Sequence, residues 1–247
     1  MSKVELGFVG QFPCDYTDQA QRITLQTQGN FSPDTIDFQA ALRQGQHIGK
    51  SNIAVTPTIR EMAVRIKAHG NATVSRIDLI THAGSGRVGL RGRVDLRRTI
   101  AGMAHEVHFA DASTSDDLLQ SPSLERAAFD EIAKDDQAKR ELEQMKNKIA
   151  KGGQLHIYAC NAGIAADTAE PLVQVIAEAL GIQTFLFKAE MGFTLSEGGK
   201  WKFHLRFRKG GRDPATGAPN TESTDQVSDY RELDKLTPFI VASVVRK

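Results

Sequence analysis

The sequence predicts an α/β sandwich, in which helices pack on a mostly parallel sheet. Segments with strand patterns alternate with segments with helix patterns along the chain, which favours this class. Of the 247 residues, 40% are apolar, which suits one large domain or two small ones with a hydrophobic core. The sequence contains no internal repeat and no low-complexity tract.

The first part of the chain contains one clear helix and one clear strand. Residues 56–71 predict the helix, because Thr56 can cap it, apolar residues recur at helical spacing, and a glycine ends it. The β-rich run within 74–84 predicts the strand, and residues 85–96 indicate a hairpin or a short irregular segment. Further elements are strands at 4–10 and 22–28 and a short helix within 31–45.

The second part predicts a longer series of elements. Residues 123–150 predict one long charged helix, whose charges indicate a solvated face. Residues 200–208 alternate between apolar and basic residues, which is typical of a half-exposed strand near a sheet edge. Residues 209–229 show neither pattern, and such a stretch is usually functional or disordered. The remaining elements are strands at 154–160, 182–191 and 238–246 and a helix at 167–181.

Charge and hydropathy exclude several classes of protein. The 31 Lys and Arg residues nearly balance the 30 Asp and Glu residues, so no overall field attracts the chain to nucleic acid or to an anionic membrane. No apolar run approaches the roughly 18 to 20 residues that span a bilayer, and the N-terminus lacks the pattern of a signal peptide. We therefore expect a cytoplasmic protein, while export without a cleaved signal stays open. Cys14 and Cys160 are too few for a disulfide framework and are interpreted as thiols.

Two predicted strands end in reactive side chains. "IDLITH" ends at His82, and "LHIYAC" ends at Cys160. Their separation of 78 positions (160 − 82) allows a long crossover, so the two strands could be parallel neighbours. Chemistry collects at the carboxyl ends of parallel strands, and a histidine beside a cysteine activates the thiol as a nucleophile. For each residue alone, a small buried cysteine and a hydrogen-bonding histidine are the alternative interpretation.

The segments "IDLITHAGSGRVGL" and "GGQLHIYACNAG" resemble the two signature strands of caspase-like cysteine peptidases. This clan CD group includes caspases, gingipains, clostripain and separase. Its members carry an apolar strand that ends in His-Gly and a later apolar strand that ends in Ala-Cys or Gly-Cys. The resemblance covers these two segments and the order of the elements around them.

The resemblance implies a caspase-haemoglobinase fold, a three-layer α/β/α sandwich, as a single domain over residues 1–247. It also implies a hydrolase that cleaves peptide bonds through an acyl-enzyme, with His82 as the general base and Cys160 as the nucleophile. The family's glycine after the histidine is Ala83 here, and Gly84 follows one position later. The backbone amides of Ala83, Gly84 and Cys160 are therefore the expected oxyanion donors, or the oxyanion hole is poorly formed.

The same resemblance implies a protein or peptide substrate and chemistry that needs no metal or cofactor. Glu190 follows a predicted strand and could form a negative pocket floor for Lys or Arg, although an exposed loop glutamate is the alternative. Many members mature by cleavage in a loop, and Lys209 and Arg212 in the stretch 209–229 offer a site for it. No oligomeric state follows from the sequence.

Four other interpretations stand beside a peptidase. "GSGRVG" (84–89) satisfies G-x-G-x-x-G, and Asp111 lies 27 residues after Gly84 (111 − 84), as in a dinucleotide site, but no clean helix pattern follows. A caspase-like scaffold without turnover, which serves as an interaction module, is the second. The basic patch 87–98 lacks interleaved aromatic residues and supports nucleic-acid binding only weakly. "HEVH" (105–108) in a strand does not fit the helical zinc motif.

Overall fold

The computed structural model describes residues 3–15, 35–84, 86–99, 102–111, 116–160, 171–196, 198–212 and 219–245. Its centre is a six-stranded sheet in which all strands but the edge strand β15 run parallel. In spatial order the strands are β15 (Ile240–Ser243), β11 (Gln183–Phe187), β10 (Ile149–Tyr158), β4 (Val74–Ile80), β1 (Val4–Val9) and β3 (Ile53–Val55).

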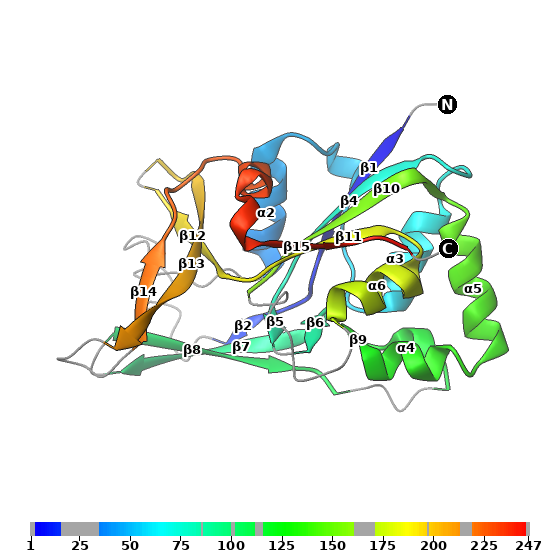
Figure 1. Ribbon diagram of the computed structural model, residues 1–247, viewed down its shortest axis with the longest axis horizontal. Helices are drawn as coiled ribbons and strands as arrows, with labels where there is room; N and C mark the ends of the chain where they lie inside the picture. The colour runs from blue at the N-terminus through cyan, green and yellow to red at the C-terminus, as the bar shows by residue number, and fades with distance from the viewer. Residues whose placement is uncertain are drawn as a thin grey trace.

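Helices cover both faces of this sheet, so the predicted α/β/α sandwich is confirmed (Figure 1). One face carries α2 (Thr35–Gly45) and the 3₁₀ helix η3 (Tyr230–Lys235). The other face carries α3 (Ile59–Lys67), α4 (Arg126–Ile132), α5 (Asp136–Lys146) and α6 (Leu172–Leu180). No helix among the described residues is long and apolar enough to cross a membrane.

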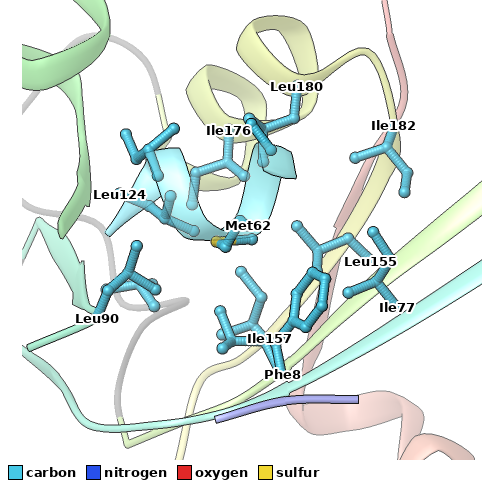
Figure 2. Close-up of a cluster of buried hydrophobic side chains, with 14 of the residues drawn as sticks. Phe8, Met62, Ile77, Leu90, Leu124, Leu155, Ile157, Ile176, Leu180 and Ile182 are labelled. Carbon is cyan, nitrogen blue, oxygen red and sulfur yellow. The ribbon is translucent and has the colours of Figure 1, made fainter. Parts of the chain in front are cut away.

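The larger hydrophobic cluster lies between the sheet and the second group of helices (Figure 2). A second hydrophobic cluster lies on the opposite face of the sheet, beneath α2 and η3. Successive strand residues point to opposite faces, so Ile77 and Leu79 of β4 belong to the larger cluster and Ile80 belongs to the second. Each fully buried side chain of this kind contributes about 1.5–3 kcal/mol. Side chains from the sheet and from two helices meet in the larger cluster: Phe8, Ile77, Leu155 and Ile157 from the sheet, Met62 from α3, and Ile176 and Leu180 from α6.

Two helix predictions are refined by the structure. Helix α3 buries its predicted apolar stripe, but Thr58 caps it in place of Thr56, because the Thr58 hydroxyl accepts the N–H of Glu61 at 3.2 Å. Helix α6 ends as predicted at Gly181, whose φ of 65° lies in the left-handed region that glycine adopts readily. The expected strand at 22–28 lies outside the described residues.

The prediction of one long helix over 123–150 is wrong. The segment begins with β9 (Ser123–Glu125) and then forms α4 and α5, which are separate helices. The Asp135 carboxylate accepts the N–H of Ala138 at 2.7 Å, so a new helix begins where the apolar stripe suggested continuity. Leu124 belongs to β9, where it pairs with Val88.

Three small sheets lie beyond the carboxyl ends of the central strands (Figure 1). Strand β12 follows β11 directly, and β5 follows β4 in the same way. The sheets consist of β12 (Glu190–Leu195), β13 (Trp201–Arg212) and β14 (Pro219–Ser223); of β2 (Cys14–Asp15), β7 (Gly92–Thr99) and β8 (Gly102–Phe109); and of β5 (Ala83–Gly84), β6 (Arg87–Gly89) and β9.

These sheets correct two predictions. The half-exposed strand expected over 200–208 is present, but its expected place near a sheet edge is wrong, because β13 is the central strand of its sheet and buries Trp201, Phe203 and Leu205. Residues 209–229 were expected to lack secondary structure, but the end of β13 and the whole of β14 lie within them. Cross-strand pairing thus orders a sequence that carries no strong strand pattern of its own.

A network of buried charges joins η3 to the centre of the sheet. The Asp78 side chain on β4 is fully buried and accepts hydrogen bonds from Arg76 at 2.6 Å, Arg231 at 2.8 Å and the Tyr230 hydroxyl at 2.7 Å. Arg231 also pairs with Glu5 at 2.7 Å. A buried carboxylate is tolerated only when charged or polar groups satisfy it, and here two guanidinium groups and a hydroxyl do so.

Asp234 on η3 extends this network to β10. Its carboxylate accepts hydrogen bonds from Arg76 at 2.7 Å and from the Tyr158 hydroxyl at 3.0 Å, and His156 Nδ1 lies 3.2 Å from it. Burial alone would raise the pKa of the Asp234 carboxyl, but the hydrogen bonds from His156 and Arg76 outweigh burial and lower that pKa. The η3 segment is therefore fixed to two neighbouring strands by charge as well as by apolar packing.

Replacing Asp78 by alanine is expected to lower the free energy of unfolding by about 3–5 kcal/mol, because Arg76 and Arg231 would keep their burial and lose a shared partner. Urea unfolding followed by the fluorescence of the single tryptophan, the buried Trp201, measures this change. The control is Glu143→Ala, which removes the exposed Glu143–Lys146 pair and should stay within about 0.5 kcal/mol of wild type. Equal effects of the two variants would contradict the role given to Asp78.

Acid is expected to weaken the attachment of η3. Because the pKa of Asp234 is lowered from 3.8, its stabilising contribution is present above that value and is lost as the pH falls through the lower folded-state pKa. Unfolding free energies measured between about pH 6 and pH 2.5 should therefore fall less steeply in Asp234→Asn than in wild type. The exposed carboxyl of Asp130 on α4 provides the control variant Asp130→Asn, which should keep the wild-type slope.

Candidate active site

His82 and Cys160 follow neighbouring strands of the central sheet. Strands β4 and β10 are parallel neighbours, as expected, and Ile80 pairs with Tyr158 at their carboxyl ends. The Thr81 N–H donates to the Tyr158 carbonyl at 3.2 Å, which extends the pairing by one residue. His82 and Cys160 therefore occupy equivalent positions, each two residues beyond the last paired residue of its strand.

A tight hairpin fixes the backbone at His82. Strands β5 and β6 pair antiparallel directly after His82, and the Gly89 N–H donates to the His82 carbonyl at 3.0 Å. The buried Thr81 hydroxyl donates to the Gly89 carbonyl at 2.5 Å, so both backbone groups of Gly89 take part. The expected oxyanion donors Ala83 and Gly84 form β5 and thus belong to an ordered hairpin.

The imidazole of His82 lies among aromatic rings. The Phe12 ring meets it edge-on with centroids 4.8 Å apart, and the Phe38 ring of α2 lies 5.2 Å away at a tilt. His82 is 8% exposed, and both phenylalanines are buried. Phe12 and Phe38 carried no signal in the sequence, because the tertiary fold alone brings them to the end of β4.

The Cys160 thiol is directed toward β12. Its Sγ donates a hydrogen bond to the Met191 carbonyl at 3.4 Å. Burial, together with the negative charge of Glu190, raises the pKa of the Cys160 thiol to about 11, although the positive charge of Arg206 acts to lower it. In this conformation the thiol is protonated at neutral pH, and its hydrogen bond is made to a carbonyl rather than to an imidazole.

Glu190, the candidate for a specificity pocket, is the first residue of β12 and is exposed. It pairs in register with Arg206 of β13, and both affect the Cys160 pKa through their charges. The structure thus places Glu190 near the candidate nucleophile, at the surface. The residue that contacts the Cys160 thiol is Met191, which follows Glu190. The sequence could not predict this contact, because the acceptor is a backbone carbonyl, which every residue type has.

The glycine motif 84–89 does not open a helix. Its described residues form β5 and β6, and β6 pairs in turn with β9. A dinucleotide fingerprint places its glycines between a strand and a helix N-terminus, so this hairpin lacks the context that the motif requires. Asp111, the acidic residue considered with it, is exposed after β8.

The segment 105–108 forms part of β8, as expected. His108 Nε2 lies 2.9 Å from a carboxylate oxygen of Asp95 on the paired strand β7, so this histidine belongs to a cross-strand polar pair. His156 and His204 are both buried; His156 joins the charge network, while His204 lies against β12.

No protein-family model matches the chain, and no curated protein matches it. The function is therefore inferred from the geometry at the ends of β4 and β10.

Proposed function

We propose that the chain is a cysteine endopeptidase of the caspase-like kind, with Cys160 as nucleophile and His82 as general base. The observation that carries the proposal is the equivalent position of these two residues beyond adjacent parallel strands. Such strand ends offer fixed positions for reactive groups, and the motif resemblance assigns the same two residues. The β5–β6 pairing fixes the backbone of Ala83 and Gly84 directly after His82, where the proposed oxyanion donors lie.

In the proposed reaction the thiol proton passes to the His82 imidazole as Sγ attacks the carbonyl carbon of a peptide bond. The negative charge that develops on the carbonyl oxygen is held by backbone N–H groups of Ala83, Gly84 and Cys160. The C–N bond then breaks, and the imidazolium returns the proton to the leaving amine. Water, deprotonated by His82, hydrolyses the resulting thioester and restores the thiol.

The aromatic rings around His82 have a defined effect in this scheme. Phe12 and Phe38 pack against the imidazole and limit the access of water to it. Productive chemistry also requires the thiol to leave the Met191 carbonyl and face the imidazole. A rotation about the Cα–Cβ bond of Cys160 is one way to achieve this.

An inactive caspase-like interaction module is the second candidate. The observation that favours it is the protonated thiol, whose pKa is raised to about 11 by burial and whose hydrogen bond goes to Met191. The two candidates predict different reactivity at Cys160, so one labelling experiment separates them.

A thiol-directed peptidyl electrophile is expected to modify Cys160, with mass spectrometry locating the adduct. His82→Ala should slow the modification by a factor on the order of 10²–10⁴, since the base is removed, and Cys160→Ala should abolish it. His69→Ala is the matched control, because His69 lies just after α3, ahead of the amino end of β4. Slow reaction of Cys160 and Cys14 at equal rates, unaffected by His82→Ala, would instead support the inactive module.

In the resting protein, the rate at which a small neutral reagent alkylates Cys160 should depend steeply on pH. Only the thiolate reacts, and a pKa of about 11 for Cys160 predicts that alkylation by iodoacetamide rises about tenfold per pH unit from about pH 7 to pH 10. In urea-unfolded chain the same rise should level off near the ordinary pKa of 9.0. A rate that is already constant above neutral pH in the folded protein would contradict the protonated thiol with a raised pKa.

A further inference from the structure

We infer that the β12–β13 hairpin keeps the candidate site in a closed resting state, by holding the Cys160 thiol on the Met191–Gly192 peptide. Movement of this peptide away from β10 then releases the thiol. The inference rests on the proposed function, because it describes the regulation of the same site. It concerns the accessibility of the thiol, which is measured without turnover.

The first support is the position of the hydrogen bond. Cys160 lies just beyond β10, and Met191 is the second residue of β12, which follows the next strand of the sheet, β11. The Met191 carbonyl therefore reaches the thiol across the carboxyl edge of the sheet, at an Sγ–O distance of 3.4 Å. Met191 is 5% exposed, so the contact is closed to solvent on that side.

The second support is that Met191 cannot move alone. It pairs with Leu205 of β13, and the next residue, Gly192, pairs with His204. Strand β13 is held from its other side as well, because the Leu205 carbonyl accepts the Thr224 N–H at 2.9 Å and the Leu205 N–H donates to the Thr224 hydroxyl at 3.0 Å. The carbonyl that holds the thiol thus belongs to an ordered three-stranded sheet.

The third support comes from the contact between Gly192 and His204. A Cβ atom at Gly192 would lie 2.2 Å from His204 Nε2, so the two strands reach this distance only because residue 192 has no side chain. His204 is 7% exposed and has little room to turn away. The carbonyl that accepts the hydrogen bond from the thiol belongs to the peptide between Met191 and Gly192. A Cβ atom at Gly192 would therefore displace this peptide.

Strand β12 also contacts the aromatic rings that surround the His82 imidazole. Phe193 of β12 lies 5.7 Å from the Phe38 ring, and Phe38 lies 5.2 Å from the His82 ring. Strand β12 therefore holds the thiol through Met191 and closes the aromatic cover of His82 through Phe193. One displacement of β12 frees both groups.

The test is Gly192→Ala in the full chain, with iodoacetamide as the probe near neutral pH and mass spectrometry to assign the adduct. The added Cβ meets His204 and displaces the Met191–Gly192 peptide, so alkylation of Cys160 should accelerate about tenfold or more. Gly198→Ala in the same hairpin is the matched control, because a Cβ there meets nothing within 4 Å and the rate should stay within about twofold of wild type.

The double variant Gly192→Ala/His204→Ala provides the rescue. Removing the imidazole makes room for the added Cβ, and the alkylation rate should return toward the wild-type value. A wild-type rate in correctly folded Gly192→Ala, or no rescue in the double variant, would overturn the inference. Circular dichroism verifies the fold of each variant.

A second measurement uses the wild-type chain and does not depend on any variant. If β12 opens locally, the rate of Cys160 alkylation in low urea should rise with urea concentration. The free energy of opening obtained from that rate should depend on urea much less steeply than the free energy of global unfolding. Equal slopes would mean that only complete unfolding exposes the thiol, and the hairpin would then have no regulatory part.

The outcomes for the two proposals are distinguishable. Faster alkylation in Gly192→Ala without any effect of His82→Ala on a peptidyl electrophile would support the closed state and refute the dyad. His82-dependent labelling of Cys160 by the peptidyl electrophile, together with iodoacetamide alkylation that is as fast in the wild type as in Gly192→Ala, would support the dyad and refute the closed state.

Discussion

The buried Asp78 carboxylate is the interaction on which much of this structure depends. It lies in the middle of β4, the strand that leads to His82, and it accepts hydrogen bonds from Arg76, Arg231 and Tyr230. Without partners such a charge would be excluded from the interior, so the segment that supplies Arg231 and Tyr230 must cover this face of the sheet. That segment leads into β15, the edge strand beside β11. The charge in β4 thus determines where the last part of the chain packs.

The candidate site is built at the other end of the same strands. The apolar packing in Figure 2 and the charge network fix β4 and β10 from opposite faces, so the residues after them have defined positions. His82 is placed by the β5–β6 hairpin and Cys160 by its hydrogen bond to Met191. The first arrangement fits a catalytic base, and the second holds the thiol in its unreactive protonated form. Both are compatible with a peptidase that rests in a closed conformation.

Much of the central sheet could be predicted from the sequence, because strands buried on both faces read as short apolar runs with abrupt ends. That pattern was sufficient to identify β1, β4 and β10 and the neighbouring positions of His82 and Cys160. The break between α4 and α5 was missed, because the apolar stripe continues across Asp135 and the cap is a local hydrogen bond. Contacts such as Cys160–Met191 and His82–Phe38 join residues distant in sequence, and no periodicity records them.

The charge network also has a consequence for the order of events during synthesis. Asp78 leaves the ribosome 153 residues before its partner Arg231. At translation rates of about 5–20 residues per second, this interval lasts roughly 8–30 s. During that time the centre of the future sheet contains a carboxylate whose later partners do not yet exist, and water must solvate it. The η3 segment therefore covers its part of this face only after residues 230–234 emerge.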